Sequence, residues 1–199
     1  MGKLADLLLT EEEQNPKPKG KLFCDMDGVL TDFVDRFDHY FGMHPNEYKE
    51  KKGDGGFWSV IAPIGQIFWE GMEWTPHGLQ LWEHIRDFNP TLLTAPSEEQ
   101  SSRDGKVEWA NRELEPIPPI IFRPAKEKHL ECTGPDDILI DDREDTIQRW
   151  IDAGGVGIYH PENGDPSNVI IRLEKLGYVK PSEERIWWKG CKSSPKHYF

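Results

Sequence analysis

Two pairs of aspartates have the spacing in this sequence that best suits chemistry. In the first pair, Asp25 and Asp27 stand two positions apart, directly after an apolar run and directly before Gly28. Both carboxylates therefore leave a strand in one turn and point into the same space at the edge of a sheet. Carboxylates this close repel each other unless a charge neutralises them, and a divalent cation is the usual partner. The alternative is an Asx-rich turn that only caps a helix, and the DxDG string favours the functional interpretation.

The second pair, Asp141 and Asp142, also follows an apolar run directly, in the string ILIDDR. If both runs are strands of one sheet, all four carboxylates meet at the same edge. Mg²⁺ takes oxygen ligands and keeps its remaining positions for water and phosphate. The two pairs together therefore predict a shared Mg²⁺ site.

A hydroxyl group and lysines follow two further apolar runs. Thr94 and Ala95 end one of them, where a hydroxyl and free backbone N–H groups suit a phosphoryl oxygen. Taken alone, Thr94 is more typical of a turn. Lys126 and Lys128 follow the other run, and a lysine beyond a strand end can supply the positive charge that this acidic edge lacks.

Short strands and helices must alternate to bring these side chains together. Five apolar runs are too short for helices and rich in branched residues, which predicts buried strands; they span residues 22–24, 91–93, 120–122, 138–140 and 156–159. Helical patterns lie between them, over residues 79–88, 107–114 and 147–151. The alternation predicts an α/β fold of the Rossmann-like kind, a parallel sheet flanked by helices on both faces, with functional residues at the carboxyl ends of the strands.

Residues 32–74 interrupt this alternation. The segment opens with an amphipathic pattern, has a middle rich in Gly and Lys, and ends in a dense aromatic series. It is longer than an ordinary connection from strand to helix, which predicts a small helical insertion above the strand ends. Its aromatic residues form either the core of the insertion or a binding surface; they are Phe33, Phe57, Trp58, Phe68, Trp69 and Trp74.

The composition limits the class of protein. A chain of 199 residues fits one domain with a modest insertion. The net charge of −12 disfavours a general electrostatic contact with a nucleic-acid polymer. No apolar run approaches membrane-spanning length and the first ten residues have no small-residue cleavage site, so we expect a cytoplasmic protein with no membrane partner. Three cysteines without a CxxC pair predict reduced thiols.

Taken together, the strand-end signals resemble the haloacid dehalogenase-like (HAD) hydrolase superfamily. The strings FCDMDGVLTD, TLLTAP, AKEKHLEC and ILIDDR match the family's four motifs in order, and the resemblance covers residues 21–159. It implies a HAD core over residues 21–31 and 75–180 and a C1-type cap over residues 32–74, with a flexible lead-in, 1–20, and a tail, 181–199. The strings DMDGVLTDF, GFW, IFWE and ILIDDREDTI are particularly similar to the 5′(3′)-deoxyribonucleotidases and their phage and bacterial relatives.

The resemblance also implies roles for the strand-end residues. Asp25 would be the nucleophile that forms an aspartyl-phosphate, and Asp27 the general acid and then the general base. Mg²⁺ would be held by Asp25, the backbone carbonyl of Asp27 and Asp141, with Asp142 contributing directly or through a water molecule. Thr94, a neighbouring N–H group and a lysine would bind the phosphoryl oxygens.

The lysine of the family motif has two main candidates in this sequence. Lys128 is preferred because of its spacing from ILIDD, whereas Lys126 lies nearer the strand end. Lys106 is a third candidate, although its place on the helix after Thr94 favours a structural or substrate-entry role. Cys24, beside Asp25, is expected to be a buried strand residue and not a second nucleophile.

These observations predict a Mg²⁺-dependent phosphomonoesterase for nucleoside monophosphates, in particular those of deoxyribonucleosides. The substrate-binding residues would be the aromatic residues Phe33, Trp58 and Trp69, which would stack on the base, together with Ala95 and Lys126. The alternatives are a HAD phosphatase for another small phosphate ester, one for a polynucleotide 3′-phosphate, which the negative charge disfavours, and a catalytically silent HAD-like binding module. A homodimer is compatible with the sequence. The aromatic, mildly basic tail either packs across the domain or contacts nucleic acid.

Overall fold

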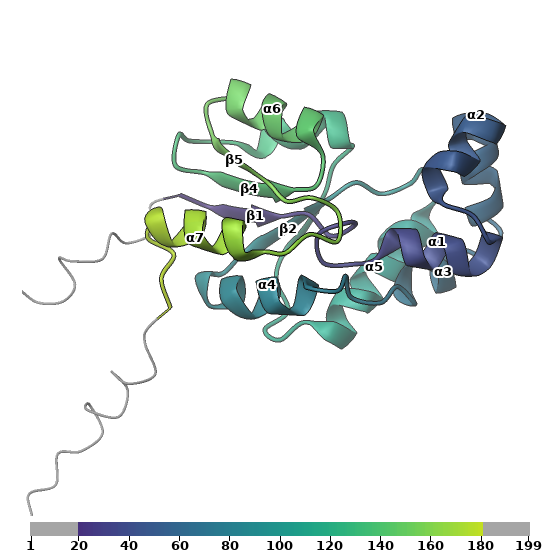
Figure 1. Ribbon diagram of the computed structural model, residues 1–199, viewed down its shortest axis with the longest axis horizontal. Coiled ribbons are helices and arrows are strands. Elements are labelled where there is room, and N and C mark those ends of the chain that lie inside the picture. The colour runs from purple at the N-terminus through teal and green to yellow at the C-terminus, as the bar shows by residue number, and fades with distance from the viewer. Residues whose placement is uncertain (1–19, 181–199) are drawn as a thin grey trace, which may run out of the picture.

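The computed structural model describes residues 20–180 and shows one parallel sheet (Figure 1). The strands are β1 (Leu22–Cys24), β2 (Thr91–Thr94), β3 (Ile120–Phe122), β4 (Ile138–Asp141) and β5 (Val156–Tyr159). They lie in the order β3-β2-β1-β4-β5, and every neighbouring pair is parallel. The first strand of the described residues is therefore the central one, and the segment that follows it begins at the middle of the sheet edge.

Helices flank this sheet and complete the α/β fold that the sequence predicts. They are α4 (Gly78–Ile85), α5 (Gln100–Glu113), α6 (Glu144–Asp152) and α7 (Ser167–Lys175), with the short 3-10 helices η2 (Arg86–Phe88) and η3 (Ala125–Glu131). Figure 1 shows α6 on one side of the sheet and α4 and α7 on the other. The prediction of a parallel sheet flanked by helices is confirmed.

The alternation of side chains along the central strands divides the core in two. Leu22 and Cys24 of β1 join the larger cluster of buried residues, which includes Trp82 of α4. Phe23, between them, points to the opposite face and joins a smaller cluster with Trp150 of α6. Successive residues of a strand face opposite sides of a sheet, so three residues are enough to anchor β1 in both layers.

The outer strands are less buried than the sequence suggests. All three residues of β3 are half-buried, and Tyr159 at the end of β5 is 42% exposed. Both strands lie at the edges of the sheet, with a neighbouring strand on one side only. The expectation of five buried strands is therefore wrong for β3, because an apolar run reports strand-forming residues and not the position of a strand in the sheet.

Three helices occupy the segment between β1 and α4: α1 (Phe33–Phe41), α2 (Pro45–Ile61), which has a kink at Gly53, and α3 (Gln66–Glu70). They lie beside the sheet, on the side toward which β1 runs (Figure 1). Gly105 of α5 packs against α3 so closely that a Cβ atom there would lie 2.6 Å from Cβ of Trp69. The division into a core and a cap stays a prediction, and α5 is the helix of the proposed core against which α3 packs.

The lead-in, apart from residue 20, and the tail, residues 181–199, lie outside the described residues. The same holds for Cys191, whereas Cys24 and Cys132 are free cysteines. Among residues 20–180, no helix has both the length and the apolar character that a membrane crossing needs.

Candidate active site

The carboxyl ends of three neighbouring strands bring the sequence-predicted residues together. Cys24 of β1 is in register with Leu92 of β2 on one side and with Ile140 of β4 on the other. The backbone N–H of Asp25 donates to the carbonyl of Ile140 at 2.9 Å, which holds Asp25 beside Asp141. Register alone thus places Asp25, Thr94 and Asp141 at one edge of the sheet.

The turn after β1 aims both of its carboxylates at this edge. Gly28 has a φ of +78°, a left-handed conformation that L side chains rarely adopt. A Cβ atom at this position would overlap the carboxylate of Asp142, so the turn requires glycine for its conformation and for its space. Oδ1 of Asp27 accepts a hydrogen bond from the hydroxyl of Thr31 at 3.1 Å, which fixes one side of that carboxyl group.

Asp25, Asp141 and Asp142 form a group of oxygen donors suited to a cation. One carboxylate oxygen from each lies within 4.8 Å of the others. Burial, followed by the charge of Asp25, raises the pKa of Asp141 to about 7. Burial, followed by the charges of Asp25 and Asp141, raises the pKa of Asp142 to about 8. The three carboxylates thus destabilise one another, as expected where a divalent cation would relieve the repulsion, and this donor set fits Mg²⁺.

Lys128 on η3 is the lysine that reaches this group. Its ammonium lies 2.7 Å from Oδ2 of Asp25 and 2.7 Å from Oδ2 of Asp141, and its side chain is 1% exposed. Burial alone would lower the pKa of Lys128, but the charges of the two aspartates outweigh burial and raise it. Lys126, two residues earlier, is exposed and lines neither cavity described below.

A second lysine reaches the site from α5. The ammonium of Lys106 lies 2.6 Å from Oδ2 of Asp27 and 2.7 Å from the hydroxyl of Thr94, and the side chain is fully buried. The sequence alone favours a structural or substrate-entry role for Lys106 over binding of the phosphate. The sequence does contain a pattern that could have indicated this role. The residues of α5 that are buried recur at helical spacing, and Lys106 is the one charged residue among them; they are Ser102, Gly105, Lys106, Trp109 and Ala110.

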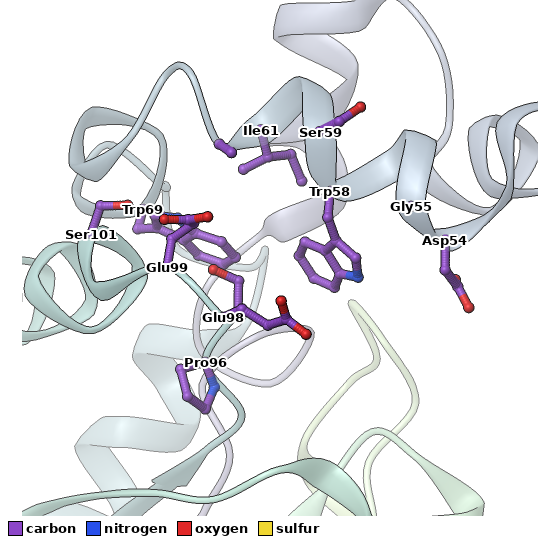
Figure 2. Close-up of a pocket in the computed structure, with 12 residues that line it drawn as sticks. Asp54, Gly55, Trp58, Ser59, Ile61, Trp69, Pro96, Glu98, Glu99 and Ser101 are labelled. Atoms are coloured by element: carbon purple, nitrogen blue, oxygen red, sulfur yellow. The ribbon is translucent and has the colours of Figure 1, made fainter.

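A cavity of about 360 Å³ opens above these groups. Asp25, Asp27, Lys128 and Asp142 line it together with the predicted substrate-binding residues Phe33, Trp58 and Ala95. Lys49 and Arg143 add positive charge to the lining, and Glu162 adds a further carboxylate. Trp69 does not line this cavity but a neighbouring one of about 600 Å³, which shares Trp58 and Pro96 with it (Figure 2). Trp58 is 40% exposed, whereas Trp69 is 2% exposed.

Cys24 lies beside Asp25, yet its thiol is unsuited to a reaction. The side chain is fully buried, and its Sγ donates to the carbonyl of Asp25 at 3.3 Å. Burial raises the pKa of this thiol well above its usual value, and the charge of Asp25 raises it further. The thiol therefore stays protonated at neutral pH, as a buried strand residue does and a nucleophile does not.

Comparison with known proteins gives similar structures but no family. No protein-family model matches the sequence, and no curated protein matches it either. A HAD-superfamily hydrolase from Ehrlichia chaffeensis is 16% identical, with a TM-score of 0.45 over 79% of this chain and 98% of that chain. A HAD family enzyme from Bacteroides thetaiotaomicron, in complex with magnesium and inorganic phosphate, is 14% identical, with a TM-score of 0.46 over 75% of this chain and 98% of that chain. At these identities and TM-scores the chain is assigned to no family, and its function rests on the site itself.

Proposed function

We propose that this protein is a Mg²⁺-dependent phosphomonoesterase that hydrolyses nucleoside monophosphates, in particular those of deoxyribonucleosides, through an aspartyl-phosphate on Asp25. The observation that carries the proposal is the meeting of five groups at one sheet edge: Asp25, Asp27, Thr94, Lys128 and Asp141. A nucleophile, an acid or base, a hydroxyl donor, a fixed cation and a metal-ligating carboxylate are the parts that phosphoryl transfer needs.

In the first step, the carboxylate of Asp25 attacks phosphorus and the bond from phosphorus to the ester oxygen breaks. Lys128 lies 2.7 Å from Asp25 and is placed to balance the charge that moves onto the phosphoryl oxygens. The backbone N–H groups of the turns would donate to the same oxygens. Thr94 is fully buried and does not line the cavity, and its hydroxyl accepts a hydrogen bond from Lys106 at 2.7 Å, so its predicted contact with phosphate would need a shift of this side chain. The leaving oxygen takes a proton from the carboxyl group of Asp27.

In the second step, Asp27 accepts a proton from water as the water attacks the phosphorus of the aspartyl-phosphate. Inorganic phosphate leaves and the carboxylate of Asp25 is restored. Both steps require Asp27 to keep one orientation. Thr31 donates to its Oδ1 and Lys106 to its Oδ2, which orients the carboxylate from both sides; the proton that Asp27 passes to the leaving oxygen would take the place of one of these two hydrogen bonds.

The acidic group supports the Mg²⁺ part of the proposal. Asp25, Asp141 and Asp142 would hold the ion, with the backbone carbonyl of Asp27 as the further ligand that the resemblance implies. When bound, Mg²⁺ supplies a positive charge that withdraws electron density from the phosphoryl group. Lys128 stays beside Asp25 and Asp141 as the permanent cation of the site.

The walls of the active-site cavity support a nucleotide as the substrate. Phe33 and Trp58 line it together with the phosphate-chemistry residues, so an aromatic surface lies next to the reacting groups. A base stacked on an aromatic side chain gains about 1–3 kcal/mol, which a small aliphatic ester cannot gain. A phosphatase for another small phosphate ester is the second candidate.

A phosphate-release assay tests the proposal. The purified protein is offered a panel of nucleoside 5′- and 3′-monophosphates, sugar phosphates and glycerol phosphate, with Mg²⁺ and with EDTA. We expect nucleoside monophosphates to be the best substrates, activity to require Mg²⁺, and Asp25→Asn, purified in the same way, to be inactive. Undiminished activity of Asp25→Asn would exclude the mechanism, and a uniform preference for sugar phosphates would exclude the nucleotide.

A further inference from the structure

The larger cavity, beside the active-site cavity, differs from it in charge. Its volume is about 600 Å³, and its lining contains two tryptophans and three carboxylates (Figure 2); these are Trp58, Trp69, Asp54, Glu98 and Glu99. No lysine, arginine or histidine is among its lining residues. The active-site cavity is also lined by four carboxylates, those of Asp25, Asp27, Asp142 and Glu162, but there Lys49, Lys128 and Arg143 accompany them.

Trp58 and Pro96 are common to both cavities, so a single ligand can contact the two. Its phosphate would lie among the basic groups, and the part of it beyond Trp58 would meet carboxylates. A second phosphate is repelled there, whereas a hydrogen-bond donor is attracted. The chemistry of the larger cavity therefore bears on which leaving group the site accepts.

Glu98 is the carboxylate best placed to contact a leaving group. Figure 2 shows its carboxylate directed toward the ring of Trp58, whereas Asp54 is directed away from both indole rings. Among residues 20–180, the side chain of Glu98 forms no hydrogen bond or ion pair, so both of its oxygens are available as acceptors.

The loop that carries Glu98 also carries the proposed phosphate-binding hydroxyl. Thr94 ends β2, and Glu98 follows four residues later, before α5 begins at Gln100. The backbone N–H of Ser97 donates to the buried hydroxyl of Ser102 at 3.1 Å, which ties the loop to the first turn of α5. The loop is thus held by β2 at one end and by α5 at the other, and this limits the distance between Glu98 and the proposed phosphate position.

We propose that Glu98 selects nucleotides whose base carries an amino group at position 4 of a pyrimidine or position 6 of a purine. The inference rests on the proposed function and adds a base preference to it. An ionised carboxylate accepts hydrogen bonds but donates none. Cytosine and adenine present an amino donor where uracil, thymine and hypoxanthine present a carbonyl oxygen, which a carboxylate repels. A base stacked on Trp58 would therefore be held by Glu98 when it carries the amino group and disfavoured when it carries the oxygen.

The test compares dCMP with dUMP, whose bases differ in the amino or carbonyl group at position 4. We expect kcat/KM of the wild-type protein to be about tenfold higher for dCMP. Glu98→Gln should bring the ratio close to one, because a glutamine side chain both donates and accepts hydrogen bonds. The pair dAMP and dIMP should behave in the same way.

Glu108→Gln is the matched control for this experiment. Glu108 is exposed on α5 and lines neither cavity, so its substitution removes the same charge at a different place and should leave the ratio unchanged. Equal kcat/KM for dCMP and dUMP in the wild-type protein, or a preference that persists in Glu98→Gln, would overturn the inference and leave the nucleotidase function intact. If no nucleotide is hydrolysed, the proposed function fails and the base preference fails with it.

Discussion

Two buried lysines form ion pairs with different carboxylates of the site. Lys128 contacts Asp25 and Asp141, and Lys106 contacts Asp27. The first pairing surrounds the proposed nucleophile and metal ligand, and the second fixes the proposed acid and base. The two lysines therefore contact different carboxylates, and we expect substitutions at the two positions to have different effects.

The contrast between Lys128 and Lys126 gives a prediction at this scale. Lys128→Ala removes the buried cation beside Asp25, so we expect kcat/KM to fall by about 100-fold or more. Lys126→Ala is the matched control, because Lys126 is exposed and lines neither cavity. Steady-state kinetics of both variants decide the assignment. Full activity in Lys128→Ala would move the phosphate-binding role to Lys106 or Arg143.

The substitution Asp27→Asn tests the proposed role of Asp27 in proton transfer. Asp27→Asn keeps a side chain of the same size that can still accept a hydrogen bond from Lys106, but it can neither give up a proton to the leaving oxygen nor take one from water. We expect kcat to fall by about 100-fold or more, with the fold retained. Kinetics together with a circular dichroism spectrum measure both. A fully active variant would remove Asp27 from proton transfer.

At the scale of elements, strand ends could be predicted from the sequence better than helix faces. Asp25 and Asp141 could be placed because an acidic residue directly after an apolar strand lies at the sheet edge whatever the rest of the fold does. The contact of Lys106 with Asp27 depends on how α5 is rotated about its axis, which is set by packing against other elements. The different burial of Trp58 and Trp69 likewise depends on where α2 and α3 come to lie.

Because Trp58 and Trp69 differ in burial, we expect their substitutions to have different effects, although the sequence predicts the same role for both. Trp58 is 40% exposed at the cavity wall, so Trp58→Ala should cost little stability. It should lower kcat/KM for nucleoside monophosphates by about ten- to a hundredfold, and leave glycerol phosphate nearly unchanged. Thermal unfolding and kinetics with both substrates measure this. A parallel loss for both substrates would show that Trp58 does not contact the base.

Trp69→Ala is expected to act through stability. Trp69 is 2% exposed, its ring packs against Phe33 and Phe68, and the ammonium of Lys106 lies 5.4 Å from its centre. Removing it should lower the free energy of unfolding by about 3–5 kcal/mol and reduce turnover of every substrate together. Denaturant titration measures the loss. Unchanged stability with a defect for nucleotides alone would place Trp69 in the binding surface.

At the scale of the whole molecule, the buried negative charge links metal binding to stability. Asp25, Asp141 and Asp142 repel one another in the folded protein, so a cation that binds them stabilises the folded state. We expect Mg²⁺ to raise the melting temperature, by an amount that grows with its concentration. The rise should be largely lost in Asp141→Asn. Asp136→Asn, at an exposed position outside this group, should keep it, and an equal rise in both variants would contradict the site.

The central position of β1 also determines when the protein can first work during its synthesis. Phe23 is in register with Thr91 and Leu139, so β1, the first strand of residues 20–180, has no partner in the sheet until β2 follows, and lacks one neighbour until β4 appears. Until then, an apolar strand has an open edge that other chains can join. A nascent chain stopped before β4 should therefore aggregate or bind a chaperone, and have no activity, although it already carries Asp25, Asp27 and Lys128.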